Sequence, residues 1–296
     1  MSAGKKIVSF ICLSILLTVC LGLFRPQKSY SEFSRDHFWT LKTHTSEKYG
    51  IVIYGDSRVY RGLAPEFVSS GTGLSCFNFG YSSGSMSQRM LDFADSHLDD
   101  TKTPVIVLGI TPYSLTVDAL KDQQFLQELN RSGYDKFQRM YIDPRLVFFD
   151  KIEPTDLFGM GTTLSEDHCT DGWVKTASPE RNLSAGLESY KKSLSGNPID
   201  QKAVDGLIRQ IAAWGKQNIT VIAYRPPTFD GMEALEDELT GFDENELASE
   251  IEAAGGFWLD LPNSGLVTYD GSHLTLESTI DVSQAINFRI KKLINR

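Results

Sequence analysis

The chain has 296 residues, of which 41% are hydrophobic, 29 are Lys or Arg and 38 are Asp or Glu. This composition excludes a disordered chain, a collagen-like repeat and a multi-span membrane protein, and the length suits one large α/β domain with a short appendage. The net charge of −9 argues against nucleic acid as a partner, because non-specific binding to nucleic acid needs a basic surface. Four cysteines are too few for a disulfide scaffold.

An uncharged apolar run follows Lys5 and Lys6 at the start of the chain. Residues 7–24 read IVSFICLSILLTVCLGLF, which as a helix is roughly 27 Å long, enough to cross the core of a bilayer. The run is either a signal peptide that is removed or a signal anchor that is retained. Its length and the lack of an A-x-A cleavage pattern favour a retained single-pass anchor over residues 1–24. The rest of the chain is then extracytoplasmic, in the periplasm or at the cell surface, and it is secreted if the run is cleaved.

Residues 25–48 are polar and mixed, without strong periodicity, and we interpret them as a stalk or docking segment. A single domain is expected over residues 49–296. Outside the cytoplasm, Cys76 and Cys169 could form a disulfide, and two separate buried thiols are an equally good interpretation.

Short apolar runs alternate with helical patterns in this domain. Because fully apolar strands separated by helices indicate a parallel sheet covered on both faces, we predict a three-layer, doubly wound α/β fold of the flavodoxin-like type. The stretch at about 116–195 is too long for one crossover and is interpreted as an inserted helical lid or rim, with a loop at 166–173. The predicted strands are residues 51–54, 74–79, 104–108, 219–224 and 257–261. The predicted helices are 86–98, 200–216 and 281–294, and the acidic stretch at 233–254 is predicted to be one or two surface helices.

Ligands of such sheets bind beyond the carboxyl ends of the strands, so the residues after each apolar run are the candidates. Ser57 follows the first run within Gly-Asp-Ser, and Asp270 and His273 precede the last helix within Asp-Gly-Ser-His. A serine can act as a nucleophile when a histidine takes its proton and a carboxylate orients that histidine. We therefore predict a catalytic Ser57–His273–Asp270 triad, with the backbone N–H groups of Ser57 and Gly80 as oxyanion donors.

These motifs resemble the SGNH (GDSL-type) hydrolase superfamily. The first block matches as YGDSRV around Ser57, the second as NFGYSSG with Gly80, and the last as DGSH with Asp270 and His273. The blocks occur in the family's order and span almost the whole domain. The resemblance implies an SGNH-type fold and an esterase or O-acyltransferase that works through an acyl-serine, with no metal and no organic cofactor.

One block departs from the family, because Thr111 stands where the third block has an asparagine that donates to the oxyanion. Loss of one such donor typically costs about 10²–10³ in rate, and the Thr111 hydroxyl is the candidate to replace it. Because of this substitution and the N-terminal anchor, the chain resembles extracytoplasmic SGNH proteins that acylate cell-surface polysaccharides. The resemblance therefore implies an acyl-ester substrate or acyl donor, a glycan or lipid acceptor, and a membrane-bound acyltransferase as a partner.

Other residues have weaker signals. Arg225 and Tyr113 follow predicted strand ends and are candidates to contact the substrate. His168 has a cysteine and two aspartates nearby, but one histidine and one cysteine without a second cluster do not make a zinc site. The competing hypothesis for the whole chain is a non-catalytic SGNH-fold scaffold that binds glycan or partners a membrane-bound acyltransferase.

Overall fold

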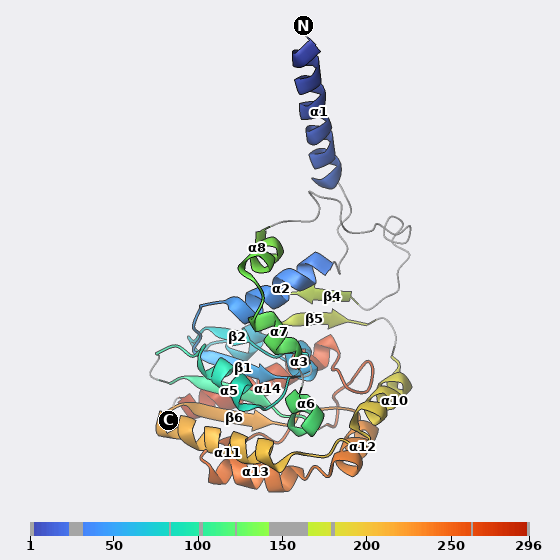
Figure 1. The fold of residues 1–296 in the computed structure, drawn as a ribbon. Coiled ribbons are helices and arrows are strands. Elements are labelled where there is room, and N and C mark those ends of the chain that lie inside the picture. The colour runs from blue at the N-terminus through green and yellow to red at the C-terminus, as the bar shows by residue number, and fades with distance from the viewer. Residues whose placement is uncertain are drawn as a thin grey trace.

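A parallel five-stranded sheet forms the centre of the molecule (Figure 1). The computed structural model describes residues 3–23, 32–82, 84–100, 103–121, 123–141, 165–178, 181–261 and 263–294. The strand order is β2-β1-β3-β6-β7, which is the doubly wound order in which the chain moves first to one side of β1 and then to the other. The strands are β1 (Ile51–Gly55), β2 (Cys76–Asn78), β3 (Val105–Gly109), β6 (Thr220–Tyr224) and β7 (Phe257–Trp258).

All five predicted strands are confirmed, and all pair in parallel. Residues that alternate along β1 face opposite sides of the sheet: Val52 and Tyr54 belong to one core, and Ile51 and Ile53 to the other. This explains why the run is apolar throughout, since both faces of the strand are buried.

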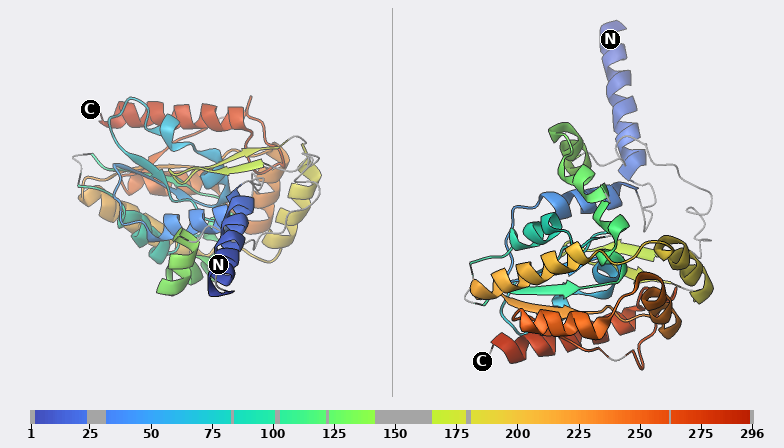
Figure 2. Two further views of the ribbon diagram at one scale, coloured as in Figure 1. Left: turned by 90° about the horizontal axis from the view of Figure 1, so that it is seen from above. Right: turned by 60° about the horizontal axis from the view of Figure 1, so that its bottom comes forward.

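Helices cover both faces and produce three layers (Figure 2). One face packs against α5 (Gln88–Asp95), α11 (Gln201–Lys216) and α13 (Glu244–Ala253). The other packs against α3 (Ser57–Gly62), α4 (Pro65–Val68) and α14 (Leu276–Ile294).

The stretch at 233–254, for which one or two surface helices were expected, forms two: α12 (Asp230–Thr240) and α13. Gly241 ends α12 in the left-handed conformation with φ of 73°. The last helix begins at Leu276, five residues before the predicted start at 281.

The described residues of the stretch at 116–195 are mostly helical, but they include a hairpin that the sequence interpretation missed. Residues 166–173 were expected to be a loop, whereas β4 (Ser165–His168) and β5 (Val174–Ala177) pair there in antiparallel fashion. Residues 142–164 of the predicted lid lie outside the described residues. The other elements of this region are η1 (Tyr113–Leu115), α6 (Val117–Lys121), α7 (Gln124–Leu129), α8 (Gly133–Tyr141) and α10 (Leu183–Leu194).

The segment interpreted as a stalk or docking segment contains a helix, α2 (Glu32–His44), that packs onto the domain. Lys42 of α2 is 1% exposed, and its Nζ donates to the carbonyl oxygen of Gly172, 2.8 Å away. The ammonium group also lies over the rings of Phe38 and Trp39, at 4.9 and 5.1 Å from their centroids. Burial lowers the pKa of Lys42 well below its usual value. The second half of the segment therefore docks on the β4–β5 hairpin.

The apolar run forms α1 (Ala3–Leu23), a helix long and apolar enough to cross a membrane. A signal sequence has the same length and composition, so the helix by itself does not distinguish the two. α1 extends away from the domain on the side where α2 and α8 lie (Figure 1).

The turn between β1 and α3 depends on the absence of a side chain at Gly55. A Cβ there would lie 2.6 Å from the carbonyl oxygen of Gly109 and 2.3 Å from Cγ2 of Val59. Gly133, at the start of α8, has no neighbouring atom within 4 Å of such a Cβ.

We expect Gly55→Ala to lower the free energy of unfolding by about 1–3 kcal/mol, because the backbone of β3 must move to admit the methyl group. Thermal unfolding followed by circular dichroism measures the change, and Gly133→Ala is the matched control with no expected loss. Equal melting temperatures for the two variants would contradict this packing argument.

Candidate active site

The site is built on the turn that joins β1 to α3. Asp56 is the N-cap of α3, and its Oδ1 accepts from the backbone N–H of Arg58 at 2.9 Å. Its Oδ2 accepts from the hydroxyl of Thr111 at 2.6 Å, which ties the turn to the end of β3. Ser57 is the first residue of α3, so its N–H has no acceptor within the helix.

Ser57, His273 and Asp270 lie within hydrogen-bond distance of one another. Oγ of Ser57 is 2.9 Å from Nε2 of His273, and Nδ1 of His273 is 2.7 Å from Oδ2 of Asp270. Ser57 follows β1 whereas the other two precede α14, so residues more than 200 positions apart meet at one edge of the sheet. With its Nδ1 proton directed at Asp270, His273 presents Nε2 as an acceptor to the serine hydroxyl.

The loop that carries His273 is held by its own backbone. Oδ1 of Asp270 accepts from the N–H groups of Ser272 and His273, at 2.9 and 2.7 Å. Burial opposes ionisation of this carboxyl group, but the hydrogen bonds from His273 and Ser272 outweigh it and lower the pKa of Asp270 to about 2. The ring of Tyr269 stacks on His273, with the planes 16° apart. The carboxylate is therefore ionised at neutral pH and the imidazole has a defined orientation.

A glycine of α10 allows this loop to approach the helix. A Cβ on Gly186 would lie 1.9 Å from the carbonyl oxygen of Asp270. The position of the triad carboxylate thus depends on a close backbone contact that no motif in the sequence marks.

Two of the three predicted oxyanion donors already have partners. The N–H of Gly80 donates to Oδ1 of Asn78 at 2.9 Å, and the hydroxyl of Thr111 donates to Asp56. Asn78 is fully buried, and its Nδ2 donates to the carbonyl oxygens of Val59 and Leu63, both at 2.9 Å. Gly80 and Thr111 therefore hold the site together in this conformation, and the N–H of Ser57 is the predicted donor without an intrahelical acceptor.

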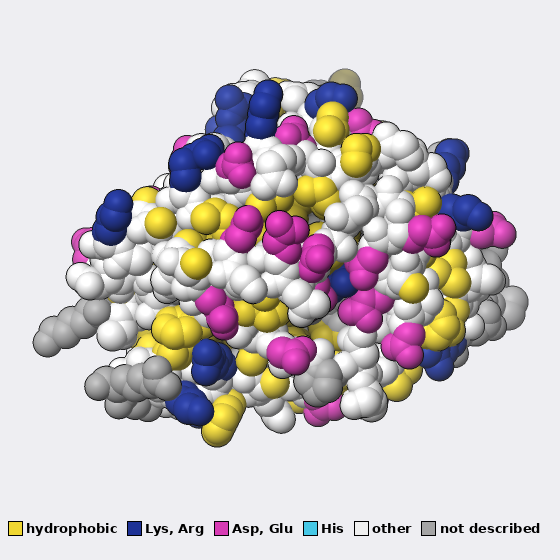
Figure 3. Space-filling view, turned by 90° about the horizontal axis from the view of Figure 1, so that it is seen from below, with side chains coloured by type: hydrophobic (Ala, Val, Ile, Leu, Met, Phe, Trp, Pro, Cys, Tyr) yellow, Lys and Arg dark blue, Asp and Glu magenta, His cyan; other side chains and the backbone are white. Residues whose placement is uncertain are grey.

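The guanidinium of Arg225 is held by acidic side chains of α12 and α13. Arg225 is 6% exposed, and its guanidinium contacts carboxylates of Glu236, Asp237 and Glu244 at 3.2, 2.8 and 3.2 Å. Acidic side chains gather around a hollow on the underside of the molecule, over α12 and α13 (Figure 3), and Arg225 lines this hollow. These contacts give Arg225 a structural role in this conformation, and its contact with a substrate stays a prediction. Tyr113, the other candidate, is half-buried at the start of η1.

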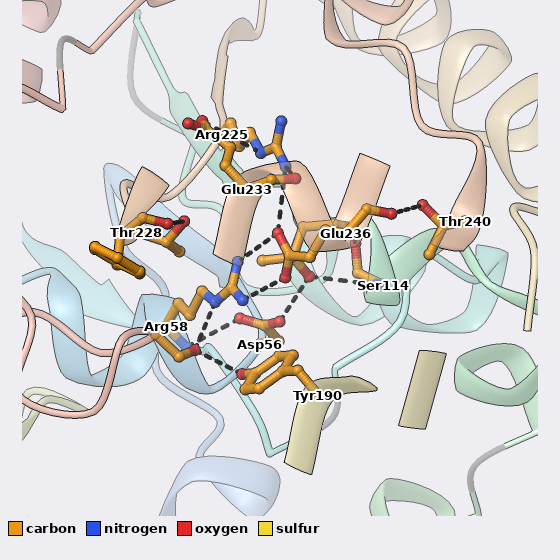
Figure 4. Close-up of polar contacts among 12 residues, drawn as sticks. Asp56, Arg58, Ser114, Tyr190, Arg225, Thr228, Glu233, Glu236 and Thr240 are labelled. Carbon is orange, nitrogen blue, oxygen red and sulfur yellow. Dashed lines mark hydrogen bonds and ion pairs between the residues drawn. The ribbon is translucent and has the colours of Figure 1, made fainter. Parts of the chain in front are cut away.

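A buried charge network next to the triad was missed by the sequence interpretation (Figure 4). Arg58 follows Ser57 directly, and its side chain is 1% exposed. Its guanidinium is paired with the fully buried carboxylate of Glu236, and its Nε donates to Oγ of Ser272 at 2.8 Å. Burial opposes the charge of Arg58, but Glu236 outweighs it and raises the pKa of the guanidinium above its usual value. The network connects the neighbour of Ser57 with the neighbour of His273.

Tyr190 of α10 completes this network. It accepts from the hydroxyl of Ser272 at 2.7 Å, and the guanidinium of Arg58 lies over its ring, 4.9 Å from the centroid. Only the proximity of arginine to Gly-Asp-Ser could have suggested a role for Arg58, since its partner Glu236 lies 178 residues away.

A cavity of about 280 Å³ lies between the loop before α5, α6 and α7, and Ser57, Asp270 and His273 are not among its lining residues. It is lined by Tyr81, Gly84, Met90 and Phe125 among others, and a Cβ on Gly84 would lie 2.5 Å from the carbonyl oxygen of Gly55. Gly84, one of the lining residues, is thus in contact with Gly55 at the end of β1.

Cys76 and Cys169 are both free thiols in the structure, so the separate-thiol interpretation describes it. Burial raises the pKa of each thiol.

Comparisons with known proteins give little beyond the general architecture. No family model and no curated protein matches the chain. One solved structure is similar over 98% of both chains, with 13% identity and a TM-score of 0.40, and is described as "a putative platelet activating factor from Streptococcus pneumonia". A likeness at this level carries no argument about the site. The chain is therefore described as an α/β protein with a parallel sheet flanked by helices, and the roles of its residues rest on motifs and geometry.

We expect Glu236→Gln to destabilise the protein by about 3–5 kcal/mol, because it leaves the buried guanidinium of Arg58 without its countercharge. The matched control is Asp118→Asn, which removes an exposed pair with Lys121 whose side chains are 63% and 70% exposed. That variant should change stability by less than about 1 kcal/mol. Comparable losses in urea titrations of the two variants would show that the buried pair does not support the fold.

Proposed function

We propose that this chain is a membrane-anchored serine esterase or O-acyltransferase of the SGNH type, acting on an acyl ester outside the cytoplasm. The observation that carries the proposal is the continuous contact from Ser57 through His273 to Asp270, at 2.9 and 2.7 Å. A nucleophile, a base and a group that orients the base are the requirements for acyl transfer through a covalent intermediate.

In the proposed reaction, Oγ of Ser57 bonds to the ester carbonyl carbon while Nε2 of His273 takes the hydroxyl proton. The bond from the carbonyl carbon to the leaving oxygen then breaks, and the departing alcohol takes that proton from His273. The acyl-serine is resolved by water, which gives an acid, or by a sugar hydroxyl, which gives a new ester. His273 removes the proton of the acceptor and returns it to Ser57.

The N–H of Ser57 is the first donor available to the oxyanion. A second donor requires Gly80 to exchange its contact with Asn78 for one with the substrate, or Thr111 to leave Asp56. Retention of α1 as an anchor would place the reaction at the membrane surface, where the acceptor is a cell-surface glycan or lipid. The proposed partner there is a membrane-bound acyltransferase.

Ser57→Ala and His273→Ala should each lower acyl-ester turnover by about 10⁴–10⁶-fold, because members of a triad act as a unit. A serine-reactive fluorophosphonate probe and an acetyl-ester substrate measure labelling and turnover. Ser193→Ala, at an exposed position of α10, is the control and should keep full labelling. Undiminished turnover in folded Ser57→Ala would refute the mechanism.

Asp270→Asn should reduce turnover by about 10⁴-fold, since the amide no longer selects the histidine tautomer. Because the pKa of Asp270 is about 2 in the folded protein and 3.8 in the reference state, its contacts stabilise the fold fully above about pH 4. That stabilisation is lost as the pH falls through about 2. The difference in stability between wild type and Asp270→Asn should therefore be constant from pH 8 to about pH 4 and shrink below it, as measured by thermal unfolding across pH.

The engaged donors at Gly80 and Thr111 favour a second candidate, a non-catalytic scaffold that binds glycan or a membrane-bound acyltransferase. The fluorophosphonate experiment separates the two. Formation of an adduct at Ser57 supports the enzyme, and its absence from a folded sample supports the scaffold.

A further inference from the structure

Exposed aromatic side chains are concentrated on α8. Outside α1, the described residues include five exposed large hydrophobic side chains, and three of them belong to this helix of nine residues. Tyr134, Phe137 and Tyr141 are 68%, 54% and 73% exposed. Their spacing of three and four places them on one face, and the rings of Phe137 and Tyr141 lie 5.4 Å apart.

The opposite face of α8 is fixed to α2. Arg139 pairs with Asp36 at 3.1 Å, and its carbonyl oxygen lies 3.2 Å from Nδ1 of His37. The aromatic face is therefore presented outward by a helix that is attached to the domain.

The chain keeps this face close to the end of α1. α1 ends at Leu23 and α2 begins at Glu32, so eight residues separate them. Even a fully extended segment of that length spans only roughly 30 Å. α8 also lies on the side of the domain from which α1 extends (Figure 1).

We propose that Tyr134, Phe137 and Tyr141 form a membrane-docking face that enters the interfacial layer of the bilayer crossed by α1. The proposal rests on the anchor assigned under the proposed function. Aromatic rings, and tyrosine in particular, favour the boundary between lipid headgroups and acyl chains, because one part of the side chain is apolar and the hydroxyl stays hydrated.

The size of the face favours lipid over a protein partner. Each ring can bury about 150–250 Å², so three rings that are partly exposed contribute roughly 300–500 Å². A stable protein interface needs about 800 Å² from each partner. A small apolar face is sufficient for lipid here, because α1 holds it at high effective concentration near the bilayer. Attachment at both α1 and α8 would restrict rotation of the domain about its anchor.

The full-length chain is reconstituted into phosphatidylcholine vesicles with and without brominated acyl chains, and tryptophan emission is compared. Phe137→Trp should lose emission in brominated vesicles beyond the loss of the wild-type chain. The matched control is Phe288→Trp, because Phe288 is 72% exposed on α14 and should show no additional loss. Equal quenching of the two variants would overturn the docking face. Absence of quenching in Phe137→Trp would also overturn it, and would leave a protein as the occupant of this face.

Flotation of the same samples separates this proposal from the anchor. If the chain floats with the vesicles but the emission of Phe137→Trp is not quenched, the docking face alone is refuted. If the chain does not float with the vesicles, both the anchor and the docking face are refuted. A triple variant, Tyr134→Ser with Phe137→Ser and Tyr141→Ser, should lose the protection of α8 amides from hydrogen exchange that vesicles confer on the wild type. Its labelling at Ser57 should be unchanged, so the result is independent of the proposed chemistry.

Discussion

The buried guanidinium of Arg58 connects the parts of the candidate site more directly than any other group. The backbone N–H of Arg58 donates to Asp56. In its side chain, Nε donates to Ser272, and the charge is neutralised by Glu236 of α12. Since Ser57 and His273 are the chain neighbours of Arg58 and Ser272, the network limits how far these two side chains can move apart. An ion pair taken out of water is costly unless its hydrogen bonds are satisfied, so this arrangement contributes geometry more than net stability.

Several glycines lie near the turn between β1 and α3, because the backbone there is closely packed. Backbone approaches backbone at Gly55 against Gly109, at Gly84 against Gly55, and at Gly186 against Asp270, with too little room for a methyl group in each case. These contacts let the ends of two strands, a loop and a helix converge on Ser57. Two donors that a motif-based interpretation assigns to the substrate are engaged here, because Asn78 accepts from the N–H of Gly80 and Asp56 accepts from the hydroxyl of Thr111. Under the proposed function, structural support and oxyanion binding would compete for the same hydrogen bonds.

The proposed membrane contacts and the proposed chemistry involve different parts of the molecule. α2 and α8 lie on the side of the domain from which α1 extends (Figure 1). The contact between Ser57 and His273 lies at the carboxyl end of β1. Lys42, enclosed by aromatic rings and bonded to Gly172, holds α2 to the hairpin of β4 and β5. The hairpin in turn reaches the site region through Glu166, which pairs with Arg61 of α3 at 2.5 Å. The docked helix is therefore continuous with the framework of the site.

The sequence by itself determined the five strands, the layered α/β fold and three side chains that meet in the structure, Ser57, Asp270 and His273. Each strand is a short apolar run buried on both faces, and Ser57, Asp270 and His273 occur in local motifs beside strand or helix ends. Tertiary structure decided the partners of Arg58, Arg225, Gly80 and Thr111, because each partner belongs to another turn or element and its distance depends on how the helices pack. It also decided that α2 docks and that 166–173 is part of a hairpin, since a half-buried surface has no strong local pattern until its neighbour is in place.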